Sequence, residues 1–595
     1  MENSGTQLYQ APASRRGLFL LTIGAALVIG LLGRLWLTSL SARWAYVWDH
    51  FDNIGMGLTA EHYGLTKVYA VDPDKNPQMI GQVYAEDGRT SITPRWPPRI
   101  ANYPPLGIAT FWLNSRLLGL SDRSVQVEVV WPDPNVRRTI TVDVIGKRVH
   151  VLVGELVERE LPDWRGRPYV IQANPSVLVN TFRTRIIMSI PSVLAELILA
   201  IGMFLLGRDL LGRRAGLIAA CVCWLFPPLA MDSSFWGQTD SWFLAPTVFF
   251  VWLMLRRRWA AAGLCAALAA LLKPQGVLLA PIALFGAAVV GGAPAESQAP
   301  SWTPAFLRAM VQSLVAPAAR GKPGLFAVRL GKMAGAGLLA IFLVTLPWMI
   351  SDGLSWVDKS YIANFTMYAE TTLLAFNVWY IDALSTDASG SLDGLDSKVT
   401  LLGTAKTSWG RLLALAAMVV LAVMSWRKYR HKPAAGLVIF SGLWLWSTFI
   451  WPTGVHERYI AYGMPLVILS AVALKRLWPA VVVLALVGAA EMTHNVWVKY
   501  PVGAFAKYAR NVTEEYYSRP PDQRASQAAL DAFLAQQREV ASKRRESSVG
   551  WEYLATLGSL GAYFWAVVAA FWGRPLQPSA PPAPHHEPRR RKQRR

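Results

Sequence analysis

Repeated apolar runs constrain this chain more than any other feature. In 595 residues, 53% of them hydrophobic, these runs recur near the length that a helix needs to cross a bilayer. Arg and Lys residues flank alternate ends of the runs, and such residues stay on the cytoplasmic side. The pattern predicts an all-α polytopic membrane protein with about 12 transmembrane helices and with both chain ends in the cytoplasm.

The runs divide the chain into a series of segments. We expect a cytoplasmic N-terminus (1–16), a transmembrane catalytic domain (17–491), a polar outer segment (492–550), a last transmembrane helix (551–573) and a Pro-rich, polybasic cytoplasmic tail (574–595). Basic residues within the outer segment, such as Lys543-Arg544-Arg545, conflict with its placement. Long loops follow the charge rule poorly, so we keep this segment outside.

The first outer loop, residues 41–182, has its own organisation. Residues 51–69 look helical, and the apolar run Pro105–Leu118 is too short to span, so it predicts a helix at the membrane interface. Three later stretches alternate apolar and polar residues and are separated by turn signals. They predict a β-rich insert, a small antiparallel sheet outside the membrane, at 122–180.

The net charge of +21 would suggest a nucleic-acid partner in a soluble protein. Here much of the Arg and Lys lies in short loops and in the tail, where it indicates orientation and attraction to anionic lipids. We therefore expect membrane lipids as partners and no nucleic acid. The three cysteines lie in apolar runs, which indicates small core residues and no disulfide framework.

Polar residues gather between the apolar runs, and the expected topology puts these clusters on one side of the membrane. The residues that stand out are Asp49 and Asp52, Asn102 and Tyr103, Gln238 and Asp240, Lys273, Asn377 and Trp379, and His456 and Arg458. Polar groups beside membrane helices are costly unless they face water or a partner. Their convergence, together with the short, Pro-interrupted spans around Lys273, predicts a binding site.

These clusters belong to motifs in a recognisable order. They are Asp52 in an outer-loop helix, Tyr103-Pro104-Pro105-Leu106, Trp236–Ser241, Lys273–Gln275, Ala375–Trp379 and His456–Tyr459. The order resembles the GT-C superfamily of membrane glycosyltransferases, and it is most similar to bacterial relatives of the second GPI mannosyltransferase. The resemblance covers roughly residues 45–460. It implies a GT-C-like fold, a lipid-phosphate-linked sugar donor and transfer on the outer face.

Sugar transfer from a lipid phosphate needs one general base, because the phosphate leaves without the acid that a glycoside requires. Asp52 is the predicted base and Asp49 is the alternative. Cations must offset the charge that grows on the phosphate. Lys273, His456 and Arg458 are the predicted phosphate-binding residues. The competing interpretations are a lysine that reaches the interface and an ion pair between Arg458 and the adjacent glutamate.

A further set of side chains is predicted to bind the sugar or the acceptor: Gln238, Asp240, Asn377, Trp379, Asn102 and Tyr103. For Asp240 the alternative is helix capping, and for Trp379 it is anchoring at the membrane interface. Asn102 and Tyr103 more simply shape their loop. The first loop contains no His-rich ligand set, so no metal site is indicated and the lipid-linked sugar is the only co-substrate expected.

The predicted function is transfer of one sugar from a polyprenyl-phosphate donor to a hydroxyl of a lipid-linked or cell-envelope glycan. The expected location is a bacterial plasma (inner) membrane with the active site facing the periplasm, and mannose is favoured by the resemblance alone. The sequence does not indicate an oligomeric state. The alternatives are a transporter or flippase, which would need polar residues deep in the spans, and a structural assembly protein. In the sequence, the polar residues gather at one face instead.

Overall fold

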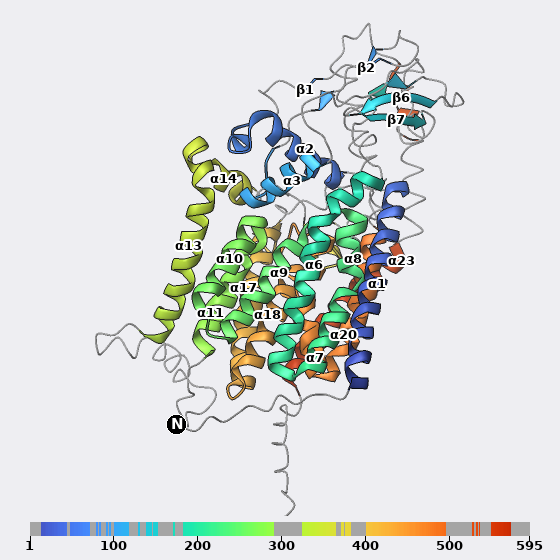
Figure 1. Cartoon of the computed structure of the whole chain (residues 1–595). Helices are drawn as coiled ribbons and strands as arrows, with labels where there is room; N and C mark the ends of the chain where they lie inside the picture. Colours follow the sequence, from blue (N-terminus) through green and yellow to red (C-terminus); the bar gives the residue numbers. More distant parts are fainter. Residues whose placement is uncertain are drawn as a thin grey trace, which may run out of the picture.

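The computed structural model is a bundle of helices with short strands beyond one end of it (Figure 1). It describes residues 13–44, 48–71, 100–117, 182–290, 324–363, 371–373, 375–381, 400–494, 526–528, 531–532, 535 and 549–572, and short strands between 79 and 172. Most of the predicted N-terminus, the tail and most of the outer segment 492–550 lie outside these residues. The same holds for most of the predicted β-rich insert.

Helices cover every predicted span. They are α1 (Ala13–Trp44), α6 (Phe182–Leu211), α7 (Arg213–Trp224), α8 (Pro227–Met231), α9 (Asp240–Leu255), α10 (Trp259–Leu272), α11 (Ala280–Val289), α13 (Leu325–Asp352), α17 (Lys406–Tyr429), α18 (Pro433–Ile450), α19 (Met464–Ala473), α20 (Trp478–His494) and α23 (Val549–Phe571). Among the described residues, 7 helices are long and apolar enough to cross a membrane, or up to 8 if a bent pair counts as one span. The chain is therefore a multi-pass membrane protein.

The remaining apolar helices are short. The helices Asp240–Leu255, Trp259–Leu272 and Pro274–Val289 each have 10–17 residues. At 1.5 Å of rise per residue they are shorter than the roughly 30 Å hydrocarbon layer. The total of about 12 spans therefore stays a prediction, because length and composition establish only the longer ones.

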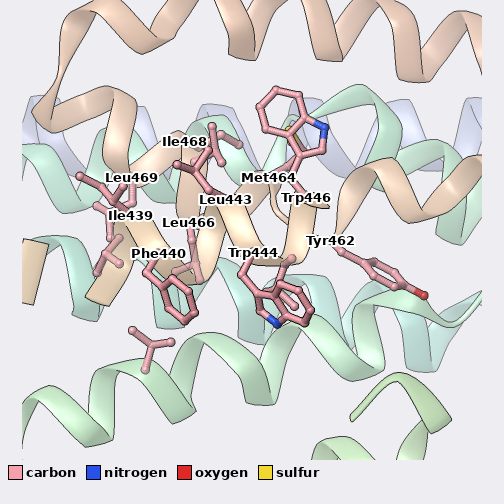
Figure 2. Close-up of a cluster of buried hydrophobic side chains, with 14 of the residues drawn as sticks. Ile439, Phe440, Leu443, Trp444, Trp446, Tyr462, Met464, Leu466, Ile468 and Leu469 are labelled. Atoms are coloured by element: carbon pink, nitrogen blue, oxygen red, sulfur yellow. The ribbon is translucent and has the colours of Figure 1, made fainter. Parts of the chain in front are cut away.

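Helix α18 lies at the centre of the bundle, where 83% of its apolar window is buried, compared with 11% for α1. Side chains of α18 and α19, among them Phe440, Trp444 and Leu466, interleave in the apolar core (Figure 2). The two segments approach closely at Gly463, where a Cβ atom would lie 2.5 Å from the carbonyl oxygen of Gly442. Glycine is required there because the backbone of the other helix occupies the space of a side chain.

Two outer-loop helices, α2 (Trp48–Tyr63) and α3 (Pro105–Leu117), lie against the end of the bundle (Figure 1). They contact each other at Gly57, where a Cβ atom would lie 2.5 Å from the carbonyl oxygen of Phe111. Helix α3 meets the end of α10 at Gly107, where a Cβ atom would lie 2.7 Å from the carbonyl oxygen of Leu272. This packing brings the outer loop to the position of Lys273.

The predicted helix at 51–69 is shorter in the structure. Helix α2 ends at Tyr63, and the short helix η1 (Val68–Ala70) follows after Gly64, which has a φ of 97°. A residue in this left-handed conformation cannot continue a right-handed helix, and glycine tolerates it best. The sequence pattern missed this break because apolar residues on both sides of it, among them Ala60 and Val68, are buried in the same apolar cluster.

The strands form separate two-stranded pairs. Strand β6 (Thr139–Val144) pairs with β7 (Lys147–Leu152), and β5 (Val129–Val130) pairs with β8 (Ile171–Gln172), all antiparallel. The other pairs are β1 (Met79–Ile80) with β4 (Arg95–Trp96), β2 (Val83–Tyr84) with β3 (Ser91–Ile92), and β9 (Thr400–Leu401) with β10 (Thr404–Ala405). A single β-rich unit at 122–180 stays a prediction.

An ion pair lies inside the spans, contrary to the expectation that polar residues gather only at one face. The Nε of Arg34 on α1 donates to Oε2 of Glu196 on α6 at 2.7 Å. Another guanidinium nitrogen donates to the carbonyl oxygen of Trp224, and the guanidinium lies over the Trp224 ring. Both charged side chains are buried. The pair therefore holds α1 to α6 and α7.

Candidate active site

A sharp reversal of the chain begins the site. Pro227 and Pro228 interrupt the span after α7, and the helix pair bends by 43°. The π-helical turn η2 (Asp232–Trp236) follows α8 and ends at Gly237, whose φ of 73° turns the chain back. The N–H of Gln238 then donates to the carbonyl oxygen of Asp232 at 2.9 Å. This loop places Asp232 and Asp240 in the same buried region.

Asp240, the first residue of α9, is fully buried and is the centre of an ionic cluster. The Lys273 ammonium contacts its Oδ1. The Tyr462 hydroxyl donates to the same oxygen at 2.5 Å, and Nε of Arg458 lies 3.3 Å from Oδ2. The capping role considered for Asp240 is wrong, because Thr239 occupies the N-cap and makes no side-chain cap bond.

Lys273 lies at the break between α10 and the short helix η3 (Pro274–Leu279). Only 2% of its surface is exposed, so it does not reach toward the interface as the competing interpretation required. Two residues later, Nε2 of Gln275 donates to the Tyr459 hydroxyl at 2.7 Å. The Tyr459 ring stacks on Tyr462 with 4.6 Å between centroids. The motif around Lys273 is thus joined to the motif around Arg458.

Arg458 lies in η8 (Glu457–Ala461), which links α18 and α19. Its Nη1 lies 3.2 Å from Oε1 of Glu457, so the expected ion pair forms, but its Nε also reaches Asp240. Burial raises the pKa of Glu457, but the interaction with His456 and the charge of Arg458 outweigh this effect, so that its pKa lies below the usual value. His456 is only partly buried and lies 3.8 Å from Glu457.

Two residues of the first outer loop contact the loop between Asp232 and Asp240. Nδ2 of Asn53 on α2 donates to the carbonyl oxygen of Gly237 at 3.4 Å, and the Thr239 hydroxyl donates to the Tyr103 hydroxyl at 3.2 Å. Asp52, partly buried, precedes Asn53 on the same helix. The side chain of Asp49, the alternative base, lies outside the described residues.

The Tyr103 segment also has a clear structural role. Its backbone carbonyl oxygen accepts hydrogen bonds from the Tyr69 hydroxyl at 2.7 Å and from the Ser360 hydroxyl at 2.8 Å. These bonds join it to η1 and to the turn that follows α13. The preceding Asn102 is partly buried. This arrangement supports the interpretation that Tyr103 shapes the loop, whereas the role of Asn102 stays a prediction.

The side chains of Asn377 and Trp379 donate hydrogen bonds to the backbone at the end of α18 and just after it. The Asn377 amide donates to the carbonyl oxygens of Phe449 and Pro452, at 3.2 and 3.3 Å, and its Oδ1 accepts the backbone N–H of Trp379. The Trp379 indole N–H donates to the carbonyl oxygen of Trp451 at 2.7 Å. These contacts stabilise the connection after α18, and they give no support to sugar binding by the two side chains.

Comparison with known families adds one finding. Residues 176–318 match the model of a dolichyl-phosphate-mannose-protein mannosyltransferase family. The match covers about a quarter of the chain and includes Asp232, Asp240 and Lys273. It supports a membrane glycosyltransferase of the GT-C type, in agreement with the apolar helices. A search of curated proteins found no match.

Two buried side chains of the cluster were not predicted from the sequence. Tyr462 follows Arg458 by four residues, a spacing that places two side chains on one helix face. Asp232 is a charged residue at the end of an apolar run, which is a recognised functional signal in membrane segments. Among the described residues, no three His, Cys, Asp or Glu side chains form a group suited to a metal ion.

Proposed function

We propose that this protein transfers a single sugar from a polyprenyl-phosphate donor to an acceptor hydroxyl on the outer face of the membrane. The family match and the motif order both favour mannose as the sugar. The acceptor is a lipid-linked or cell-envelope glycan. The site faces the periplasm of a bacterial inner membrane, as the distribution of basic residues indicates.

The buried pair of cations carries this proposal. Lys273 and Arg458 contact the two oxygens of one carboxylate, Asp240, at the end of the bundle that α2 and α3 cover. A lysine ammonium has three N–H donors, and its contact with Asp240 uses one of them. A phosphate oxygen fits the remaining donors, and charge-assisted bonds of this kind are about twice as strong as neutral ones.

The reaction requires one proton acceptor on the side of the sugar opposite the phosphate. The oxygen of the acceptor hydroxyl attacks the anomeric carbon, and the bond between that carbon and the phosphate oxygen breaks. The electron pair leaves with the phosphate, and Asp52 takes the proton of the hydroxyl. Lys273 and Arg458 stabilise the charge on the departing polyprenyl phosphate, as preorganised cations do at reacting phosphates.

A transfer assay tests the donor. The purified protein is reconstituted in proteoliposomes and is supplied separately with radiolabelled polyprenyl-phosphate mannose, glucose and arabinose, together with a membrane glycan extract. Transfer from the mannose donor, with little from the other two, is the expected result. Label that crosses the bilayer but remains on the donor lipid contradicts the proposal and indicates a flippase.

Substitution of the base is the second test. Asp52→Asn keeps the size and polarity of the side chain but cannot take the proton, so turnover should fall by about 10²–10⁴-fold. Donor affinity should change little, because the cations are untouched. Glu61→Gln is the matched control, since Glu61 lies on the same helix and pairs with Arg116. Normal turnover in Asp52→Asn with a loss in Asp49→Asn assigns the base to Asp49, and normal turnover in both excludes the mechanism.

A further inference from the structure

Asp232 is a buried carboxylate that the chemistry above does not use. Its side chain is 1% exposed, and neither of its oxygens accepts a hydrogen bond from the part of the chain that the structure describes. A buried polar atom without a partner is costly, and in a folded protein it calls for an explanation. The charges of Asp240, Lys273 and Arg458 act on it, which places it beside the ionic cluster.

Gln238 presents a second acceptor of the same kind. It is 1% exposed, and its Oε1 has no hydrogen-bond partner within the described residues. Its backbone N–H donates to the carbonyl oxygen of Asp232, so the two residues close one turn. Two side chains of this loop therefore offer acceptor oxygens that lack donors.

The nearest donors do not satisfy Asp232. The Lys273 ammonium and the Tyr462 hydroxyl both contact Oδ1 of Asp240, and neither oxygen of Asp232 has a hydrogen-bond partner within the described residues. The missing partner must supply hydrogen-bond donors and must fit beside a phosphate-binding cation. The phosphodiester of a polyprenyl-phosphate sugar has only acceptor oxygens, so it supplies no hydrogen-bond donor to Asp232. A sugar has neighbouring hydroxyl groups, and each is a donor, so a hexose bound to that phosphate fits both requirements.

Resting on the proposed function, we propose that Asp232 and Gln238 accept hydrogen bonds from two hydroxyls of the donor sugar and so select the sugar that is transferred. Lys273 and Arg458 bind the phosphate, whereas Asp232 and Gln238 bind hydroxyl groups of the sugar ring attached to it. A site built to bond a hydroxyl discriminates strongly against a ligand that lacks it, because the buried acceptor is then left unpaired.

Binding of two lipids tests this assignment. The affinities of polyprenyl-phosphate mannose and of sugar-free polyprenyl phosphate are measured for the protein in nanodiscs. Asp232→Ala should weaken binding of the sugar-bearing lipid by about 2- to 12-fold, the usual loss for a hydrogen bond between neutral groups. It should leave the sugar-free lipid unchanged, whereas Lys273→Ala should weaken both.

Two further variants distinguish a loss of sugar binding from a folding defect. Gln238→Met removes the second acceptor at similar length and should lower only the affinity for the sugar-bearing lipid. Asp358→Ala is the matched control, because Asp358 also begins a π-helical turn, η5 (Asp358–Ile362), but is exposed. It should change neither affinity.

The outcomes separate the two proposals. Equal weakening of both lipids by Asp232→Ala and Gln238→Met, in a protein that still transfers sugar, overturns the sugar-reading role alone. The same role is overturned if the wild-type protein binds both lipids equally well. Absence of transfer from any donor, with selective loss of sugar binding in the variants, overturns the proposed reaction and leaves the sugar-binding role supported.

Discussion

The buried carboxylate of Asp240 contacts two cations and the hydroxyl group of a tyrosine. The ammonium of Lys273 and the hydroxyl of Tyr462 share one carboxylate oxygen, and Arg458 approaches the other. Removing one member of such a buried group leaves an uncompensated charge, which costs far more than the intact pair contributes. The cluster therefore has a structural role in the free protein as well as the proposed role toward phosphate.

This coupling predicts non-additive stability. Lys273→Met and Asp240→Asn should each destabilise the protein by about 3–5 kcal/mol, because each leaves a buried charge unpaired. The double variant should lose clearly less stability than the sum of the losses in the two single variants, because both charges are then removed together. Thermal unfolding in one detergent tests this. Additive losses in the double variant would show that the two side chains are not coupled.

At the scale of single elements, the attachment of α1 depends on a few contacts. Most of this helix faces outward, with 11% of its apolar window buried. Its contacts with the bundle include the pair of Arg34 with Glu196 and the indole N–H of Trp224, which donates to the carbonyl oxygen of Ala26 at 3.0 Å. The Trp224 ring lies where a side chain of residue 30 would project, so this position requires glycine.

A pair of glycine substitutions tests this attachment. In Gly30→Leu, the new Cβ atom would lie 2.0 Å from Nε1 of Trp224, so α1 must move or the ring must leave its place. We expect a loss of about 1–3 kcal/mol, the usual cost of overpacking. Gly24→Leu on the same helix has nothing within 4 Å of the new atom and should unfold like the wild-type protein. Equal unfolding temperatures for the two variants would contradict the packing described for α1.

At the scale of the whole molecule, motifs from distant parts of the chain meet at one end of the bundle. The outer loop contributes α2 and α3, the turn after α8 contributes Asp232 and Asp240, and the connections after α10 and α18 contribute the cations. One end of a membrane protein faces one compartment. The orientation of the whole chain in the membrane therefore determines which compartment the site faces.

Cysteine labelling tests that side. Positions such as Ser234 and Lys273 are unsuitable because they are buried, whereas Leu354 at the outer end of α13 is 62% exposed. In a background that lacks the three native cysteines, Leu354→Cys should react with an impermeant thiol reagent from the periplasmic side. Arg258→Cys, exposed at the end of α9 expected to be cytoplasmic, should not react. The reverse pattern would place the site in the cytoplasm.

The sequence by itself determined where the membrane helices of this protein lie along the chain. Lipid requires backbone groups to bond within each segment, so long apolar runs must be helices. Each predicted span lies on helical residues, and the break at Pro274 was visible because proline cannot continue a helix, whereas the break at Pro227 was not predicted. The polar clusters were visible for the same reason, since polar residues next to lipid are rare.

Only the tertiary structure decided which of these polar residues meet. Asp240 contacts Lys273 across 33 positions of sequence and Tyr462 across 222, distances that no local pattern encodes. Asn377 and Trp379 looked equally suited to bind a ligand, yet their side chains donate to the carbonyl oxygens of Phe449 and Trp451 at the end of α18. A buried polar residue needs a partner. Helix packing determines which residues find one within the protein, and neither oxygen of Asp232 has a hydrogen-bond partner in the part of the chain that the structure describes.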